Sequence, residues 1–137
     1  MPPTDAELRE ILRRARRIAV VGLGVKRTRP AWGVAAYLQR AGYVIVPVHP
    51  VADVALGEPV RRTLVDAAAD GPVDIVNVFR RSDAIPGIVA PCVAIRPMLV
   101  WLQEGVRHDE SAHQLEAAGI PVVQDRCLAV EHHLLGV

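Results

Sequence analysis

The sequence predicts an α/β fold, a doubly wound parallel sheet of about five strands with helices on both faces. Short valine-rich runs alternate with helix-like segments about every 25 residues, which is typical of βαβ units. Hydrophobic residues make up 51% of the chain and aromatic residues only 4%, a composition that suits strands buried on both faces. The length of 137 residues fits one domain of ordinary size, so we treat 1–137 as a single domain.

The order of elements follows from the capping, Pro and Gly residues that separate the periodic runs. Thr4 and Asp5 are good N-cap residues for a first helix. Pro30 suits the first turn of a later helix, and Gly42 suits its end. Pro91 stands late enough in another helix to kink or end it. The expected elements are a helix at 4–15, a strand at 18–23, a helix at 30–41, a strand at 43–48, a loop at 51–60, a short helix at 63–69, a strand at 73–79, a helix at 84–94, a strand at 98–102, a helix at 111–118, a strand at 121–124 and a helix at 129–135.

The spatial order of the strands is a further expectation. Right-handed crossovers favour a doubly wound sheet with order 3-2-1-4-5, in which the switch point lies beside the first strand. Ligands of such sheets bind at the carboxyl ends of the strands. The polar and unusual residues of this sequence concentrate at those ends, which predicts a site there.

Charge and cysteine content exclude several classes of protein. The formal net charge of +1 provides no general field for nucleic acid or a membrane surface. No apolar run approaches the roughly 20 residues that span a bilayer, and residues 1–17 lack the apolar core of a signal peptide. Cys92 and Cys127 show no paired spacing, which favours free thiols. We therefore expect a cytoplasmic protein whose partner is a small molecule, with a protein partner or a homo-oligomer left open.

The stretch from Ile18 to Thr28 carries the main functional signal. Four apolar residues lead into Gly22 and Gly24, and then into basic and hydroxyl residues before the helix at Pro30. A strand, a glycine turn and a helix N-terminus together present backbone N–H groups to an anion. A tight turn without a ligand is the structural alternative. The pattern predicts a nucleotide-binding site.

The same stretch departs from the common dinucleotide and nucleoside triphosphate motifs. Arg27 stands where a third glycine would complete the NAD fingerprint, and the second strand ends at His49 without the acid that an NAD ribose needs. The Walker spacing is absent, which argues against a magnesium-dependent NTPase. Lys26, Arg27 and Arg29 suit a ligand with more phosphate than NAD. A solvated loop is the alternative for these cations, and a backbone-bonded loop residue is the alternative for His49.

Other conspicuous residues have simple structural explanations. Trp32 suits core packing and a ligand-facing wall equally, and Trp101 suits the core. Arg80 and Arg81 could form surface ion pairs with Asp83 or Glu110. Cys127 could be an inert thiol, although Arg126 and the following helix could make it reactive. The paired histidines at 132–133 are expected on the surface, and the spacing of His108 and His113 does not favour a metal site.

Several segments together resemble a family of small stand-alone coenzyme A-binding proteins. These have a Rossmann-like domain of the kind found in the alpha subunit of succinyl-CoA synthetase. The resemblance covers about residues 5–133, and the segments occur in the family's order. They are IAVVGLG, RPAWGVAAYLQRAGYVIVPVHP, LGEPV, VDIVNVFRRSD, VWLQEGV and AGIPVVQDRC.

The resemblance implies a coenzyme A site built from the strand ends. The glycine loop and the next helix would hold the phosphates. The loops after the second and third strands would flank the adenine and ribose. The ends of the fourth and fifth strands would line the far wall of the cleft. The implied residues are Gly22, Leu23, Gly24, Lys26, Arg27, Arg29, Pro30, Trp32, Val48, His49, Pro50, Val78, Phe79, Arg80 and Gln103.

This chain departs from the family at three of its positions. The family commonly has Ser where Gly24 and Ala31 stand, and Asn where His49 stands. The two hydroxyl donors to phosphate are therefore absent, although the backbone donors remain.

Three hypotheses follow from the sequence. The first is non-catalytic binding of coenzyme A or acyl-CoA, because the phosphorylated histidine and the grasp domain of the synthetases have no counterpart here and no catalytic residue is evident. The second is an NAD(P)-dependent oxidoreductase or redox sensor, since the basic residues could take a 2′-phosphate. The third is a coenzyme A-binding subunit of an acyl-CoA synthetase that needs a partner chain. Cys127 is the candidate reactive thiol, and a mixed disulfide with coenzyme A is expected if it faces the cleft.

Overall fold

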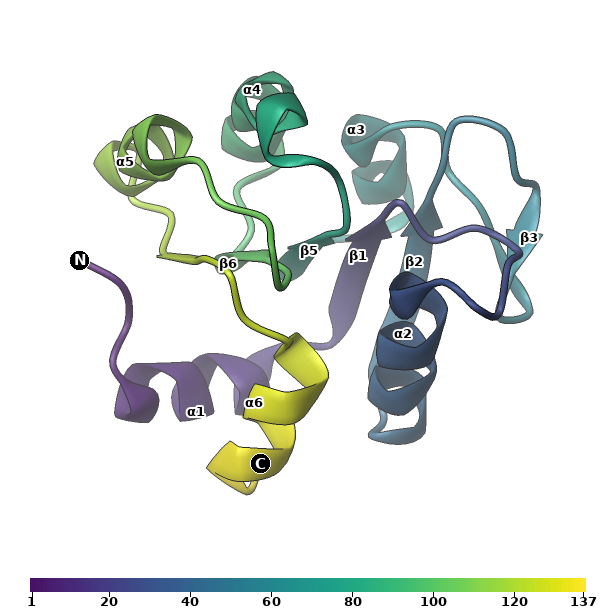
Figure 1. Cartoon of the computed structure of the whole chain (residues 1–137), viewed down its shortest axis with the longest axis horizontal. Coiled ribbons are helices and arrows are strands. Elements are labelled where there is room, and N and C mark those ends of the chain that lie inside the picture. The colour runs from purple at the N-terminus through teal and green to yellow at the C-terminus, as the bar shows by residue number, and fades with distance from the viewer.

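The computed structural model describes all residues from Met1 to Val137 as alternating strands and helices (Figure 1). The strands are β1 (Arg17–Val21), β2 (Val44–Val48), β3 (Val54–Ala55), β4 (Glu58–Pro59), β5 (Ile75–Val78), β6 (Leu99–Leu102) and β7 (Val122–Val123). The α-helices are α1 (Asp5–Arg14), α2 (Pro30–Arg40), α3 (Leu64–Ala67), α4 (Pro86–Ile95), α5 (Asp109–Ala117) and α6 (Leu128–Leu135), and 3₁₀ turns span Ala68–Asp70 and Ser82–Ala84. None of the helices has the length and apolar character that crossing a membrane requires.

The main sheet has five parallel strands in the order β2-β1-β5-β6-β7. The α/β class is confirmed, but the predicted order 3-2-1-4-5 is wrong, because the third long strand, β5, pairs with β1 instead of lying outside β2. The segment after β2 occupies that outer edge. The Arg61 N–H donates to the Pro47 carbonyl at 2.8 Å, and the His49 N–H donates to the Arg61 carbonyl at 3.0 Å. The chain then crosses over β1 before β5 begins.

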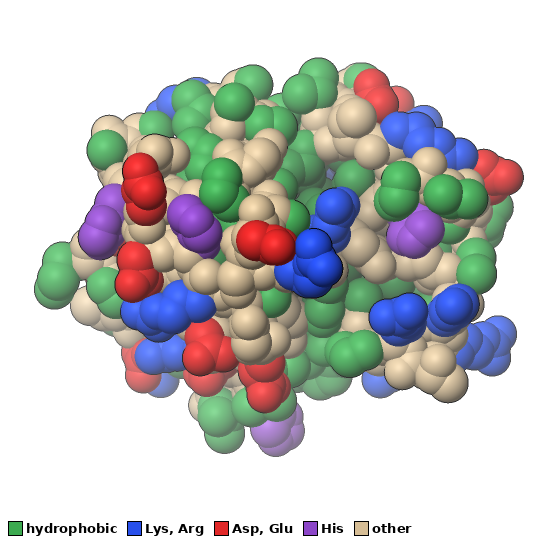
Figure 2. All heavy atoms as spheres, turned by 45° about the horizontal axis from the view of Figure 1, so that its top comes forward, with side chains coloured by type: hydrophobic (Ala, Val, Ile, Leu, Met, Phe, Trp, Pro, Cys, Tyr) green, Lys and Arg blue, Asp and Glu red, His purple; other side chains and the backbone are tan.

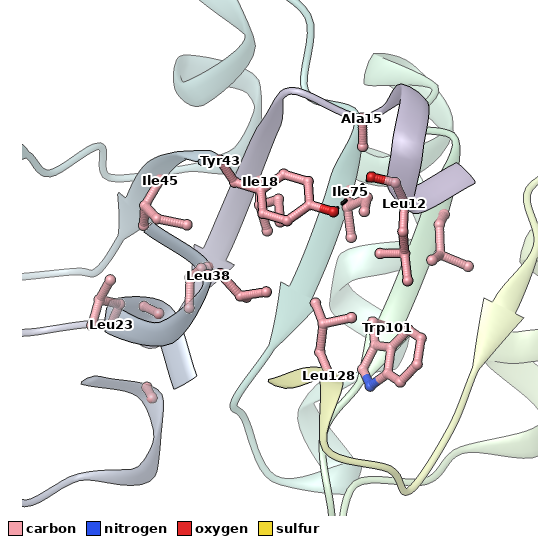
Figure 3. Close-up of a cluster of buried hydrophobic side chains, with 14 of the residues drawn as sticks. Leu12, Ala15, Ile18, Leu23, Leu38, Tyr43, Ile45, Ile75, Trp101 and Leu128 are labelled. Carbon is pink, nitrogen blue, oxygen red and sulfur yellow. Dashed lines mark hydrogen bonds between the residues drawn. The ribbon is translucent and has the colours of Figure 1, made fainter. Parts of the chain in front are cut away.

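Helices cover both faces of this sheet and create two cores. Helices α1, α2 and α6 pack on one face, and α3, α4 and α5 pack on the other (Figure 1). Trp101 lies in the first core, as predicted, and its indole N–H donates to the Arg126 carbonyl at 2.8 Å. Tyr43 enters the same core, and its hydroxyl donates to the Leu12 carbonyl at 2.6 Å (Figure 3). Asn77 is fully buried in β5 and its side-chain amide has no hydrogen-bond partner, which costs about 1–3 kcal/mol of stability.

Two local predictions differ from the structure. The segment expected as a loop at 51–60 contains a small hairpin of β3 and β4, because Leu56 and Gly57 both adopt positive φ, at 51° and 73°. Such a pair forms the tight turn that matches strand twist. Pro91 lies inside α4 without ending it; the helix continues to Ile95 and stops at Arg96, which is left-handed.

The prediction that both histidines of α6 lie on the surface is wrong for His132. This side chain is 6% exposed, and its Nδ1 lies 2.9 Å from the Tyr37 hydroxyl. Its ring also meets Tyr43 edge-on at 5.6 Å between centroids. Burial, with a smaller contribution from His133, lowers the pKa of His132. Helical periodicity alone did not reveal that α1, α2 and α6 meet around this position.

Candidate functional site

A cleft of about 960 Å³ opens at the carboxyl edge of the sheet, between the loops that follow β1, β2, β5 and β6. Its volume lies within the range typical of small-molecule sites. Figure 2 shows this edge turned toward the viewer, with basic side chains on both sides of a hollow that exposes hydrophobic atoms. The cleft is therefore where the topology predicts a ligand, outside the carboxyl ends of parallel strands.

Gly22 directly follows β1 and contacts the ends of β2 and β5. Its φ is +98°, a conformation that side chains disfavour, and a Cβ there would lie 2.6 Å from the Phe79 carbonyl oxygen. Its N–H donates to the Val48 carbonyl at 2.8 Å. Only glycine therefore allows the chain to turn between the ends of β2 and β5.

The loop after Gly22 leaves its backbone donors free. The N–H groups of residues 23–28 donate no hydrogen bond within the protein. The loop leads directly into α2, which has Pro30 at its first position and no side-chain cap from Arg29. Successive free N–H groups next to a helix N-terminus form a concave site for an anion.

Hydrogen bonds from the residues that follow His49 hold its ring over this loop. Its Nδ1 accepts hydrogen bonds from the N–H groups of Val51 at 3.1 Å and Ala52 at 3.0 Å. The ring proton is therefore on Nε2. A Cβ on Gly24 would lie 3.0 Å from that Nε2. A side chain at position 24 would therefore crowd the His49 ring. Glycine at 24 and histidine at 49 are two departures from the family pattern, and they lie against each other.

Basic side chains outnumber acidic ones in the cleft. Lys26 and Arg29 line one side, Arg80 and Arg81 line the other, and Glu104 is the acidic lining residue. Arg81 also lies 3.3 Å from Asp83, but both side chains are exposed and such pairs contribute little. Arg80 makes no ion pair. The cleft thus holds cations that the protein does not neutralise, as an anionic ligand requires.

The far wall of the cleft combines β6 with the start of α6. Gln103 is 5% exposed, and its Oε1 accepts the Leu128 N–H at 3.2 Å. Its Nε2 has no partner in the protein. Cys127, half-buried, is the N-cap residue of α6 and lines the cleft beside it. Cys92 lies in the other core, where burial raises the pKa of its thiol to about 12.

The structure brings most of the predicted site residues to this cleft. The predicted residues that line it are Gly22, Gly24, Lys26, Arg29, Pro30, His49, Pro50, Phe79, Arg80, Gln103 and Cys127. Leu23, Val48 and Val78 instead have side chains buried in the two cores. Arg27 lies over the ring of Trp32, 5.3 Å from its centroid, and neither lines the cleft.

Sequence reasoning missed several lining residues. They are Val25, Ala31, Val34, Val51, Ala52, Arg81, Glu104, Gly105 and Val106. Arg81, Glu104 and Gly105 lie at strand ends that the sequence had marked, so their position was a usable signal. The small apolar residues carried none, because only the packing of the loops turns them toward the cleft.

The fold and this cleft define a Rossmann-like domain with a glycine loop at the carboxyl edge of its sheet. The model of the CoA binding domain family matches residues 16–133, and the chain belongs to that family. The uncharacterized protein YneT of Bacillus subtilis (strain 168) is 42% identical over 130 residues, which is 95% of each chain.

Two solved structures share the whole architecture. Cell-free ID.343 from Thermus thermophilus is 44% identical, with a TM-score of 0.91 over 97% of this chain and 99% of its own. A hypothetical protein from Pyrococcus horikoshii OT3 is 29% identical, with a TM-score of 0.92 over 100% of this chain and 97% of its own. The resemblance to small coenzyme A-binding proteins is thereby confirmed.

Proposed function

We propose that this protein binds coenzyme A or an acyl-CoA in the cleft and acts as a binding module. The observation that carries this proposal is the run of free N–H groups at 23–28, which adjoins Lys26, Arg29 and the start of α2. Backbone donors and cations together favour several phosphate oxygens at one place. Coenzyme A has a pyrophosphate and a further phosphate, so it uses such a surface better than a ligand with a single phosphate.

The remaining parts of coenzyme A have matching surfaces in the cleft. Pro50 and Phe79 offer apolar faces near the glycine loop, where adenine and ribose would lie. The amide-containing arm would then extend along the far wall, where the Gln103 Nε2 is an available donor. This orientation places the most polar part of the ligand against the free N–H groups and its thiol end away from them.

Binding without catalysis is supported by the chemistry of the lining residues. Nucleophilic and acid–base catalysis use side chains joined by hydrogen bonds, with one orienting the next. In this cleft no hydrogen bond joins His49, Glu104 and Cys127 to one another, and the Nδ1 of His49 is occupied by backbone N–H groups. The groups that remain available are donors and cations, which hold an anion.

Isothermal titration with coenzyme A and dephospho-coenzyme A tests the proposal. We expect saturable one-to-one binding of coenzyme A and weaker binding of the dephospho form, which lacks one phosphate. No binding of either by the purified protein would refute it. Fluorescence titration with NADPH tests the dinucleotide alternative: a flat response rejects it, and binding tighter than that of coenzyme A would replace our proposal.

A synthetase subunit that needs a partner is tested separately. Affinity purification of the tagged protein from its native cells would recover a stoichiometric grasp-domain chain if that alternative holds. Native mass spectrometry of the same sample shows whether coenzyme A is already bound. We expect the ligand without the partner chain.

A further inference from the structure

Cys127 differs from Cys92 in its exposure and in its access to the cleft. Cys92 is fully buried in the core, and its raised pKa keeps it protonated. Cys127 is partly exposed and lines the cleft. Its side chain makes no capping hydrogen bond to α6, so the Sγ is not committed to the protein. A disulfide in the cleft would therefore meet Cys127 alone.

The neighbouring hydrogen bonds locate Cys127 relative to the phosphate loop. The Arg126 N–H donates to the Leu102 carbonyl at 3.4 Å, and the Leu128 N–H donates to Gln103 Oε1. Cys127 therefore lies over the end of β6, and only β5 separates β6 from β1 in the sheet. Two strand spacings place it about 10 Å across the sheet from the glycine loop. A ligand anchored at that loop must extend across the cleft to reach it.

A second observation is an unpaired hydrogen-bond donor on the same wall of the cleft. Gln103 is 95% buried, and its oxygen is used by the Leu128 N–H. Its Nε2 has no protein partner, yet the residue faces the cleft beside Cys127. The Nε2 is not sealed in the core, since Asn77 alone has buried side-chain atoms without a partner, so this N–H₂ group is free to donate to a ligand in the cleft. The amide carbonyls of the coenzyme A arm are acceptors of this kind, and the thiol lies beyond them.

We propose that Cys127 captures the thiol end of the bound ligand as a mixed disulfide, when that ligand arrives as the disulfide of coenzyme A. The inference rests on the proposed function, because the phosphate loop must first anchor the ligand. The protein would then hold coenzyme A covalently under oxidising conditions and release it when a thiol reductant is present.

The reaction is a thiol–disulfide exchange and balances without another oxidant. The Cys127 sulfur, as thiolate, attacks one sulfur of the ligand disulfide. The ligand S–S bond breaks as the new bond between Sγ and the ligand sulfur forms. The second coenzyme A leaves as a thiolate and takes up a proton, which balances the proton lost by Cys127. One disulfide is consumed and one is formed.

Intact mass spectrometry after incubation with coenzyme A disulfide tests this step. We expect a single adduct, heavier by one coenzyme A less two hydrogen atoms, that dithiothreitol removes. The rate should saturate with ligand concentration, because binding precedes reaction. Oxidised glutathione lacks the nucleotide, so at low concentration its reaction should be slower by a factor on the order of 100.

Matched variants distinguish capture in the cleft from general thiol reactivity. Cys127→Ser should give no adduct, and Cys92→Ala should react as the natural chain does. The substitution Gln103→Glu keeps the oxygen that accepts the Leu128 N–H but removes the free donor, and it should raise the half-saturating concentration. Desulfo-coenzyme A, which binds without a thiol, should compete with the reaction.

The outcomes separate this inference from the proposed function. Calorimetric binding of coenzyme A without any adduct would overturn the inference and leave the function standing. An adduct on Cys127 that forms linearly, at the same rate with glutathione disulfide, and with no calorimetric binding, would overturn both. An adduct on Cys92 would overturn the assignment of the thiol.

Discussion

The two edges of the sheet use similar polar groups in opposite ways. At the amino edge, the Asp74 carboxylate accepts the N–H groups of Arg16 at 2.8 Å and Arg17 at 2.9 Å. The Arg17 guanidinium donates to the carbonyls of Gly71 at 2.6 Å and Pro72 at 2.9 Å. At the carboxyl edge, the N–H groups of 23–28 and the Arg80 guanidinium have no such partners.

This difference separates stability from binding. At the amino edge, the Asp74 carboxylate and the Arg17 guanidinium are paired with backbone groups of the protein, so they stabilise the fold. At the carboxyl edge, the N–H groups of 23–28 have no partner in the protein and are left for a ligand under our proposal. Substitutions at the first edge should therefore change the free energy of unfolding, and substitutions at the second should change ligand affinity.

Gly22 is the position where one substitution should change both stability and ligand affinity. Its expected effects are the largest. In Gly22→Ala, the positive φ and the overlap with the Phe79 carbonyl should lower the free energy of unfolding by about 2–4 kcal/mol and abolish coenzyme A binding. Urea denaturation and calorimetry measure the two effects. Gly87→Ala is the control, because a Cβ at this α4 position meets nothing within 4 Å, and it should be neutral or slightly stabilising.

Asp74 tests the amino edge alone. Asp74→Ala should lower the free energy of unfolding by about 2 kcal/mol, since two backbone N–H groups lose a charged acceptor. The affinity of the folded protein for coenzyme A should stay within about twofold, because the sites are independent. Asp83→Ala, which removes an exposed surface pair, should change stability by less than about 0.5 kcal/mol. A large loss of affinity in Asp74→Ala would show that the edges are coupled.

Lys26 tests the carboxyl edge alone. Lys26→Ala should weaken coenzyme A binding about tenfold and leave the urea midpoint unchanged, because an exposed cation in the cleft contributes to the ligand and not to the fold. The affinity of the natural protein should fall as salt is added, and less so in the variant. Arg40→Ala, an exposed cation at the far end of α2, is the matched control. Equal losses in the two variants would contradict the assignment.

Gly24 and His49 test whether a single crowded contact shapes the cleft. Gly24→Ala should weaken binding several-fold, because the added Cβ displaces the His49 ring. The same substitution in a His49→Ala background should cost less, with a coupling free energy of about 0.5–1 kcal/mol. Calorimetry on the four proteins of this cycle gives the value. Additive losses would mean that the two residues act separately.

His132 tests how the free energy of unfolding depends on pH. The folded state lowers the pKa of His132, so the unfolded state takes up its proton more readily. Stability from this group is therefore present above its ordinary pKa of 6.5 and is lost as the pH falls through the lower folded value. Urea midpoints between about pH 7 and 5 should decline less in His132→Gln than in the natural chain. His113→Gln, an exposed control on α5, should behave as the natural chain.

Local patterns predicted most of the elements and the position of the site. The valine runs at β1, β2, β5 and β6 and the glycine turn at Gly22 are short-range signals, and their positions agree within a few residues. The order of the strands was wrong because periodicity identifies a strand but not which edge of its neighbour it joins. In the structure Arg61 pairs with Val48 along the outside of β2, and β5 pairs with β1.

The sequence by itself determined that a glycine loop with cations would stand at the carboxyl end of a parallel sheet. Gly22, Lys26 and Pro30 specify that unit through local backbone geometry, over a few adjacent residues. Only the tertiary structure decided that the donors at 23–28 stay unpaired, that His49 lies against Gly24, and that Gln103 and Cys127 share one wall. The physical reason is that these relations join segments far apart in the chain, and only packing brings those segments into contact.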